Sequence, residues 1–336
     1  MAPLTLGLAL ATAAPATVHG ATAVVSPADT ATPYVWRLPR GFPTPAVPAD
    51  NPMSVAKVAL GRRLFFEPRL SVTGQYSCAS CHQPALAYTD GRALAVGATG
   101  QPLIHSAMSL VNVAYNISFG WTRRDVLSLE QQMLEPMLNG HPVELGLAGC
   151  EAAVCASLAA DAEYRAAFAT AFPSTPITLA NIINAIAAFE RTLISGSSPF
   201  DRYVFGGEHD AISPQAKRGM QLFYSSRAGC GTCHSGFNFN GNWRDSQGVT
   251  GAPAFANNGS SDRPMRVPTL RNIALTAPYM HDGRLTTLEA VLDHYTRVAQ
   301  LAASDPKLRT FNLSPDERAD VIAFLQTLTD AEFSGR

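Results

Sequence analysis

The spacing of apolar residues along this chain predicts helices and very little strand. Apolar residues recur at intervals of three and four between Thr178 and Ser195, which places them on one face of a helix. This face consists of Leu179, Ile182, Ile183, Ile186, Phe189 and Leu193. Further helices are predicted to begin at residues that favour the first helical turn, namely Ser54, Ser213, Thr286 and Ser314. Because no run alternates between apolar and polar residues over a useful length, we expect a mostly α-helical fold.

A short pattern, Gly-x-x-Leu-Phe-aromatic, occurs twice, at residues 61–66 and 219–224. Each copy lies on a predicted helix and precedes a Cys-x-x-Cys-His motif, the first at 78–82 and the second at 230–234. Two linked motifs that recur in the same order indicate an internal duplication. The chain is therefore predicted to consist of two related halves.

The chain is long enough for two domains. Its 336 residues, 46% of them hydrophobic, suffice for about two buried cores. We place the boundary near Gly206 and Gly207, which gives domains at 24–205 and 206–336. The stretch 245–264 is rich in glycine, asparagine and proline and is predicted to be a mobile loop.

The balance of charges excludes some classes of partner. Lys and Arg number 25 against 26 Asp and Glu, which gives a net charge of −1. Such a chain offers no strongly basic surface for a nucleic acid or an anionic membrane. A small molecule or another protein is the expected partner.

The N-terminal segment, residues 1–23, has the character of an export signal. It contains an apolar run too short to span a bilayer and ends in small residues. We predict a signal peptide that is cleaved on export, a mature protein in the bacterial periplasm and no stable membrane anchor. The alternative interpretation is a disordered, alanine-rich tail.

The two Cys-x-x-Cys-His motifs predict covalently attached haem. Two cysteines separated by two residues can form thioether bonds to the vinyl groups of one haem, and the adjacent histidine can bind its iron. A zinc site would need four closing ligands, and a redox dithiol would not need the histidine. We therefore predict two cytochrome c-like domains with one haem c each. The attachment residues are Cys78, Cys81 and His82 in one domain and Cys230, Cys233 and His234 in the other.

Cys150 and Cys155 are the remaining cysteines. Export would permit a disulfide between them. Five residues apart on a continuous helix, however, the two side chains would be too far apart and would point in different directions. The sequence leaves both a local disulfide and two free thiols open.

Peroxide chemistry would need one haem with an open position and a nearby group that moves protons. Glu144 lies in the segment that follows the first motif, and its carboxylate could take a proton from bound peroxide and return it to the departing oxygen. Several other acids lie in the same region. A surface acid in a turn is the alternative interpretation of Glu144.

The second haem has a candidate ligand on the helix predicted from Thr286. Tyr295 falls on the apolar face of this helix, whereas His294 is rotated by about 100°. Periodicity therefore favours Tyr295 as the residue that faces inward. An ordinary core tyrosine is the alternative, and Met265 and Met280 are possible sulfur ligands.

Trp121 lies between the two motifs in the sequence and is one of three tryptophans. Its side chain is readily oxidised and could relay electrons between the two sites. Packing in a core or an interface is the alternative.

These features together resemble the bacterial di-haem cytochrome c peroxidase and MauG superfamily over nearly the whole mature chain. The matching segments are 64–71, 107–116, 142–146, 188–193, 267–272 and 276–283. Within the superfamily the chain is most similar to the MauG-like, MbnH-type enzymes. These place a distal tyrosine where Tyr295 falls, whereas the peroxidases place a methionine in this region, and no methionine follows Met280.

The resemblance implies a role for each candidate residue. His82 becomes the proximal ligand of a five-coordinate, peroxide-binding haem, with Glu144 and Gln132 in its distal pocket. His234 and Tyr295 become the two ligands of a six-coordinate haem.

The resemblance also implies a tryptophan between the haems and a bound calcium ion. Trp121 matches that tryptophan, while Asn112, Thr276 and Pro278 match the positions that hold calcium through oxygen donors. One position departs from the pattern, because Ala228 stands where MauG uses a surface tryptophan to communicate with its protein substrate. A route to a protein substrate would have to differ here.

The implied function is that of a periplasmic di-haem enzyme that uses hydrogen peroxide to form a bis-ferryl state. This state would oxidise an aromatic residue of a partner protein, a tryptophan by the MbnH-type resemblance. One alternative is a cytochrome c peroxidase that reduces peroxide to water with electrons from a small cytochrome or cupredoxin. The other alternative is a non-catalytic electron-transfer cytochrome.

Overall fold

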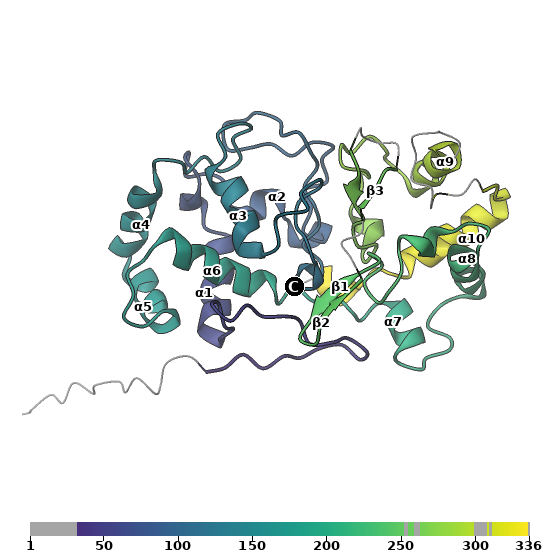
Figure 1. The fold of residues 1–336 in the computed structure, drawn as a ribbon, viewed down its shortest axis with the longest axis horizontal. Helices are drawn as coiled ribbons and strands as arrows, with labels where there is room; N and C mark the ends of the chain where they lie inside the picture. The colour runs from purple at the N-terminus through teal and green to yellow at the C-terminus, as the bar shows by residue number, and fades with distance from the viewer. Residues whose placement is uncertain (1–31, 252–254, 259–262, 299–307, 309–310, 335–336) are drawn as a thin grey trace, which may run out of the picture. The chain divides into compact units, whose positions relative to one another are not determined.

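The computed structural model describes residues 32–251, 255–258, 263–298, 308 and 311–334, and the predicted signal peptide lies outside them. The described chain is mostly helical, which confirms the predicted fold class (Figure 1). The α-helices are α1 Val55–Phe65, α2 Cys78–Cys81, α3 Leu129–Leu138, α4 Glu151–Ala160, α5 Ala162–Ala171, α6 Leu179–Glu190, α7 Pro199–Val204, α8 Pro214–Tyr224, α9 Leu288–Val298, α10 Pro315–Gln326 and α11 Ala331–Ser334. Short 3-10 helices are η2 Pro68–Leu70, η3 Pro84–Leu86, η4 Val113–Tyr115, η5 Cys230–Thr232 and η6 Ile273–Leu275.

Four short strands form two antiparallel pairs within the described residues. Strand β1 Trp243–Asp245 pairs with β2 Gly248–Thr250, and β3 Phe255–Ala256 pairs with β4 Met265–Arg266. The prediction of a loop over 245–264 was therefore wrong where β2 and β3 lie. Residues 252–254 and 259–262 of that stretch lie outside the described chain.

Most of the helices predicted from the sequence begin at the expected residues. The hydroxyls of Ser54, Ser213 and Ser314 each accept a hydrogen bond from a backbone N–H of the first turn, which satisfies a donor that the helix itself leaves unpaired. Helix α9 begins one residue later than predicted. The hydroxyl of Thr287, not that of Thr286, accepts a hydrogen bond from the third residue along, at 3.1 Å.

Helix α6 ends at Glu190, earlier than the predicted Ser195. The backbone beyond it is bound by a residue distant in sequence. The carbonyl of Leu193 accepts from the N–H of Asn112 at 2.9 Å, and the N–H of Ser195 donates to the Asn112 side-chain oxygen at 2.8 Å. Between Glu190 and these contacts the backbone N–H groups of Thr192 and Leu193 bind carbonyls three residues back, so the chain has left the helix although the apolar spacing continues.

The two copies of the glycine pattern perform the same packing role. A Cβ on Gly61 of α1 would lie 1.8 Å from the carbonyl oxygen of Ala185 on α6. A Cβ on Gly219 of α8 would lie 1.8 Å from the carbonyl oxygen of Asp320 on α10. In each half, therefore, only glycine allows the helix before the haem motif to pack this closely on a later helix (Figure 1).

A second repeated device also supports the duplication. Asn112 and Asn272 both adopt left-handed backbone conformations, with φ of 55° and 58°, and each begins a 3-10 helix. The side-chain oxygen of each accepts a backbone N–H at 2.8 Å, from Ser195 and from Asp330 respectively. Equivalent asparagines thus tie down equivalent segments in the two halves.

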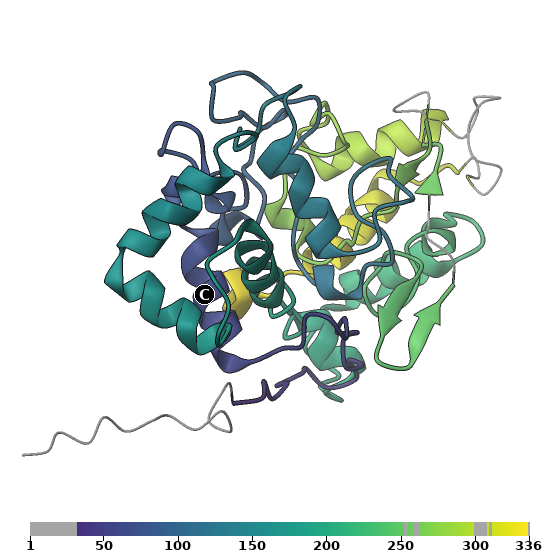
Figure 2. The same ribbon diagram turned by 60° about the vertical axis from the view of Figure 1, so that its left-hand side comes forward.

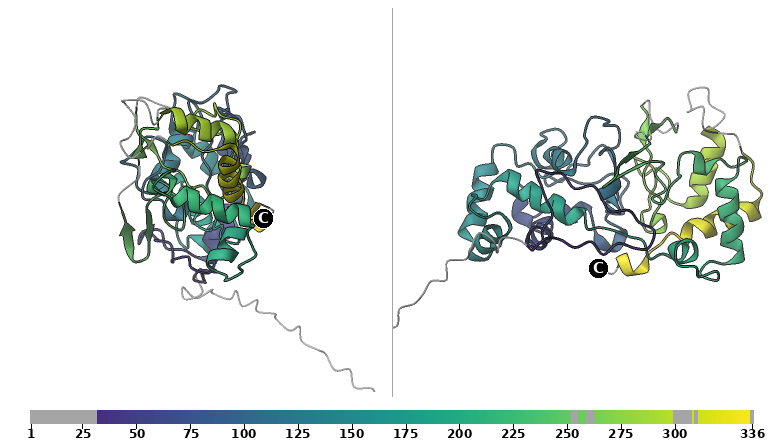
Figure 3. Two further views of the ribbon diagram at one scale, coloured as in Figure 1. Left: turned by 90° about the vertical axis from the view of Figure 1, so that its right-hand side faces the viewer. Right: turned by 60° about the horizontal axis from the view of Figure 1, so that its bottom comes forward.

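The two halves have separate apolar cores, and the C-terminal segment of the chain packs into the first of them. Phe333 of α11 belongs to the first core and packs on Tyr88 with ring centroids 5.7 Å apart. Figures 2 and 3 show the yellow C-terminal segment returning to the N-terminal half. Outside both cores, Phe42 of the N-terminal arm packs on Phe237 with ring centroids 4.9 Å apart. The boundary between residues 205 and 206 stays a prediction.

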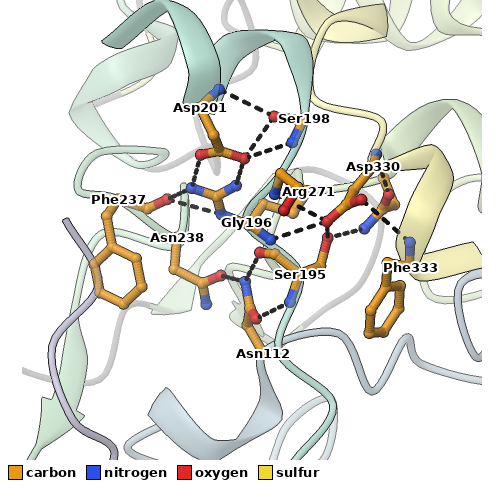
Figure 4. Close-up of polar contacts among 12 residues, drawn as sticks. Asn112, Ser195, Gly196, Ser198, Asp201, Phe237, Asn238, Arg271, Asp330 and Phe333 are labelled. Atoms are coloured by element: carbon orange, nitrogen blue, oxygen red, sulfur yellow. Dashed lines mark hydrogen bonds and ion pairs between the residues drawn. The ribbon is translucent and has the colours of Figure 1, made fainter. Parts of the chain in front are cut away.

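A buried ion pair stabilises the segment that connects the halves (Figure 4). Arg271 is fully buried and forms two hydrogen bonds of 2.9 Å to the carboxylate of Asp201. Asp201 also accepts from the N–H and hydroxyl of Ser198, which caps α7. Asp330 binds the neighbouring backbone N–H groups of Gly196 and Ser197 at 3.0 Å.

Replacing Asp201 with Asn should destabilise the protein strongly, because the Arg271 charge would remain buried without its partner. Breaking a buried pair in this way costs about 3–5 kcal/mol. Urea unfolding should show this loss. Glu208→Gln is the matched control, because Glu208 pairs with Arg202 on the surface, where such pairs contribute about 0–1 kcal/mol. Equal small losses in both variants would contradict the assigned importance of the buried pair.

Candidate active site

The first Cys-x-x-Cys-His motif lies on the short helix α2, which begins in a capping box between Ser77 and Ser80. This turn places both cysteines and His82 along one wall of a cavity of about 390 Å³. Glu144, Gln132 and Trp121 line the same cavity. The structure thus brings together all the residues predicted for the peroxide-binding site.

Both histidines of the motifs are held in one orientation by backbone carbonyls. His82 Nδ1 lies 2.9 Å from the carbonyl oxygen of Tyr88, and His234 Nδ1 lies 2.8 Å from that of Phe239. Burial lowers the pKa of each imidazole, which favours the neutral form. A neutral ring that donates from Nδ1 presents its Nε2 lone pair, the arrangement that an iron ligand requires.

The carbonyls that orient these histidines come from an unusual backbone conformation. Tyr88 and Phe239 have φ of 60° and 53°, in the left-handed region that bulky side chains rarely adopt. Such strain persists only where the surroundings hold it. Its occurrence at both motifs indicates that histidine orientation is a constraint on each half.

The cysteine environment differs from that of a reactive redox dithiol. Burial raises the pKa of Cys81 to about 12 and that of Cys230 to about 11, so neither thiol is the readily formed thiolate that attacks disulfides. Within the described chain, no group of three or more His, Cys, Asp or Glu side chains could hold a metal ion. The volume of the first cavity falls within the range of about 300–1,000 Å³ that is usual for ligand pockets.

Glu144 lies on a segment that is anchored on both sides. Its neighbour Leu145 donates to the carbonyl of Pro136 at the end of α3, and the Glu144 carbonyl accepts from Ala98, at 2.8 and 2.7 Å. A Cβ on Gly97 would lie 1.9 Å from the carbonyl oxygen before Glu144, so this contact requires glycine. Burial, with a smaller contribution from nearby Glu135, raises the pKa of Glu144 to about 7. A carboxyl with this pKa can both donate and accept a proton near neutral pH.

Arg266 connects the two cavities, and the sequence analysis missed it. Its side chain is 7% exposed and lines both cavities, while its backbone N–H donates to the Trp121 carbonyl at 2.8 Å. Burial lowers the pKa of the guanidinium to about 10, so it is still cationic at neutral pH. Among the described residues it forms no salt bridge. Since a buried cation needs a counter-charge, the carboxylates of bound haem fit this position.

The second motif lines a cavity with Tyr295, as predicted. Cys230, Cys233 and His234 share this cavity with Tyr295 and Met265, and burial raises the pKa of Tyr295 to about 12. The cavity measures about 90 Å³, because large side chains including Arg266 and Phe311 line it.

The other candidate ligands of the second haem differ in whether they line this cavity. His294 is buried but its Nε2 lies 2.8 Å from the carbonyl oxygen of Asn258. Met280 does not line the cavity, and its sulfur accepts from the Asn258 amide at 3.8 Å. Met265 does line it, so it remains an alternative to Tyr295.

The side chains of two of the predicted calcium residues are hydrogen-bonded within the protein. The Asn112 amide is occupied by backbone groups of Ser195 and by the Asn238 side chain. The Thr276 hydroxyl donates to the carbonyl of Ile273 at 3.2 Å. The calcium assignment to Asn112, Thr276 and Pro278 therefore stays a prediction.

Glu190, which lies within the matching segment 188–193, is another cavity residue that was not predicted from the sequence. It lines the first cavity and is 5% exposed, and its Oε2 has no hydrogen-bond partner among the described groups. Burial is the main cause that raises its pKa from 4.5 to about 8. No local pattern in the sequence distinguishes Glu190 from a surface acid at the end of a helix.

This raised pKa predicts that stability falls as pH rises. The folded protein keeps the Glu190 proton up to about pH 8, whereas the unfolded chain releases it near pH 4.5. The free energy of unfolding should therefore decrease between these values, and Glu190→Gln should reduce the slope. Urea unfolding across this range tests the prediction. Glu163→Gln, at an exposed ion pair with Arg63, should leave the slope unchanged, and an unaltered slope in Glu190→Gln would contradict the assignment.

Cys150 and Cys155 are both free thiols in the structure. In the part of the chain that the structure describes, no helix has the length and apolar character needed to cross a membrane.

Comparison with known proteins identifies both halves. Residues 55–209 match the family model described as di-haem cytochrome c peroxidase, and residues 216–329 match that of cytochrome c. Methylamine utilization protein MauG of Methylorubrum extorquens is 39% identical over 87% of this chain and 83% of that protein. Cytochrome c551 peroxidase of Nitrosomonas europaea is 34% identical over 85% of this chain and 84% of that protein.

Solved structures give the same result. The crystal structure of a MauG-like protein associated with microbial copper homeostasis matches with a TM-score of 0.85 and 35% identity, covering 90% of this chain and 97% of that one. The di-haem peroxidase BthA of Burkholderia thailandensis, at a TM-score of 0.65 and 23% identity, covers 90% of this chain and 94% of that one and supports the fold alone. The prediction of two cytochrome c-like domains is confirmed.

Proposed function

We propose that this chain, which belongs to the di-haem cytochrome c peroxidase and MauG family, oxidises a tryptophan side chain of a partner protein. The members of this family are haem-dependent oxidoreductases that act on peroxide. The observation that carries this proposal is the position of Tyr295 in the cavity of the second haem motif. A tyrosine oxygen stabilises an oxidised iron better than the neutral thioether of methionine does. The second site can therefore store an oxidising equivalent, as the predicted two-haem state requires.

The residues of the first cavity have complementary roles. The haems, when bound, supply the cleavage of peroxide and the storage of its two oxidising equivalents. Glu144 accepts a proton at the bound peroxide oxygen and returns it to the departing oxygen, and the Gln132 amide orients the peroxide by hydrogen bonding. Trp121 lies against Arg266, which reaches both cavities, and this position supports a role in sharing the oxidising equivalents.

The proposal also covers the kind of partner protein and the cell compartment in which the enzyme acts. One solved relative is described as associated with microbial copper homeostasis, and we extend the proposal to a copper-binding partner protein. The predicted signal peptide supports action in the periplasm. We also propose that the protein binds one calcium ion.

Reduction of peroxide with electrons from a small cytochrome or cupredoxin is the second candidate function. Met265 favours it, because this methionine also lines the second cavity. The non-catalytic cytochrome is not retained, because the family consists of enzymes that act on peroxide.

The two functions differ in what the fully ferric protein does. The proposed enzyme should react with peroxide without prior reduction, and an exported copper-binding protein added afterwards should gain mass at a tryptophan. A small reduced cytochrome should be the poorer reductant. A requirement for prior reduction, with rapid turnover of the cytochrome and no mass change, would establish the second candidate instead.

A further inference from the structure

The last residue of α8, Tyr224, is exposed although it lies against the second haem motif. Its exposed fraction is 47%. A Cβ placed on Gly231 would lie 2.5 Å from Cδ1 and 3.1 Å from Cε1 of the Tyr224 ring. The ring therefore packs directly on the backbone between Cys230 and Cys233, a contact that only glycine at position 231 permits.

The inner side of the ring is held by other aromatic residues. Its centroid lies 5.1 Å from that of Phe223 and 6.4 Å from that of Phe324, both of which are buried in the second core. These contacts hold the Tyr224 ring in one orientation against the motif, whereas an ordinary surface side chain is free to move. One face of the phenol thus lies at the haem-attachment loop while the residue reaches solvent.

Among the described residues, no other aromatic side chain near the second motif both contacts the haem-attachment loop and is exposed to solvent to this extent. Tyr295 lines the cavity itself. Trp243 lies near Gly236, where a Cβ would be 2.7 Å from its ring, but it is only partly exposed and its indole N–H donates to Asp245 at 3.2 Å. Ala228 is 5% exposed, and its methyl group cannot be oxidised in this way.

We infer that Tyr224 is a relay residue that carries oxidising equivalents from the second haem site to a partner protein docked at the surface. This inference rests on the proposed function and names its exit route. In each step Tyr224 gives one electron to the oxidised second site and its phenolic proton to solvent. The aromatic side chain of the partner then returns one electron to Tyr224, which regains a proton from solvent. Two such steps supply the two electrons that, with two protons, reduce one hydrogen peroxide to two water molecules.

Trapping experiments on the ferric holoprotein test this route without a partner. Peroxide is added in the presence of a nitroso spin trap, the two-haem spectrum is followed, and the adduct is located by peptide mass spectrometry. The adduct is expected on Tyr224 and should be lost in Tyr224→Phe. Tyr203→Phe is the matched control, since Tyr203 lies on α7 and packs on Lys217 away from the motif. It should retain the adduct.

A second variant separates loss of the relay from loss of structure. Tyr224→Trp keeps an oxidisable ring, so the adduct should move to the new side chain, and all variants should form the same oxidised two-haem state. An adduct on Trp243, or an adduct that persists unchanged in Tyr224→Phe, would overturn the relay. If the wild-type protein shows no oxidised two-haem state, the proposed function is overturned and the relay falls with it.

Discussion

Glu144→Gln should slow the reaction of the ferric protein with peroxide by about 10²–10⁴-fold, the range that general acid–base catalysis contributes. The amide has nearly the same size but cannot accept the peroxide proton. Stopped-flow spectroscopy of the bound haem measures this rate directly. An unchanged rate would show that the buried carboxyl of Glu144 has no part in proton transfer.

The same residue predicts the pH dependence of this reaction. Burial raises the pKa of Glu144 to about 7, so the carboxylate that accepts the proton predominates only above this pH. The rate should rise as pH increases through about 7 and then level off, and Glu144→Gln should remove the rise. Glu135→Gln is the matched control. It removes a nearby negative charge, so the rise should move to lower pH while the maximal rate is retained.

Tyr295→Phe should remove one ligand of the second haem and convert its low-spin ferric signal to another form. The ring would still fill its place among the residues of the second cavity, so the loss would report the missing oxygen alone. Electron paramagnetic resonance of the ferric protein measures the change. His294→Gln should leave the signal unaltered, because His294 is directed to the carbonyl of Asn258.

A third variant, Met265→Leu, tests whether Met265 is the ligand of the second haem in place of Tyr295. If Tyr295→Phe leaves the low-spin signal intact and Met265→Leu abolishes it, the tyrosine assignment is wrong. The second site would then have the thioether ligand expected of a peroxidase that uses a small electron donor. The proposed storage of an oxidising equivalent would lose its chemical basis.

Local sequence patterns predicted those parts of the fold that depend on neighbouring residues. The hydroxyls of Ser54, Ser213 and Ser314 begin helices because each binds N–H groups only a few residues away. Helical periodicity favoured Tyr295, which lines the cavity, but it did not predict that His294 is buried as well. The two glycine patterns predicted equivalent helix contacts. At Gly61 and Gly219 the facing helix comes so close that there is room for a hydrogen atom but not for a Cβ.

The features that were missed depend on contacts between distant segments. Helix α6 ends at Glu190, and Asn112 binds the backbone of Leu193 and Ser195 beyond it, contacts that periodicity within the helix cannot reveal. Glu190 and Arg266 have functional surroundings only because several elements bury them together at the cavities. A charged residue has the same appearance in a sequence whether it is buried or exposed, so burial had to come from the structure.

We propose that the two haem sites share the oxidising equivalents of one peroxide. Mössbauer spectroscopy of the ⁵⁷Fe-enriched ferric protein, before and after one equivalent of hydrogen peroxide, tests it most directly. We predict that the signals of both irons change together and return together when the stored equivalents are consumed. A change confined to the His82 site, with the His234 site remaining ferric, would contradict the account.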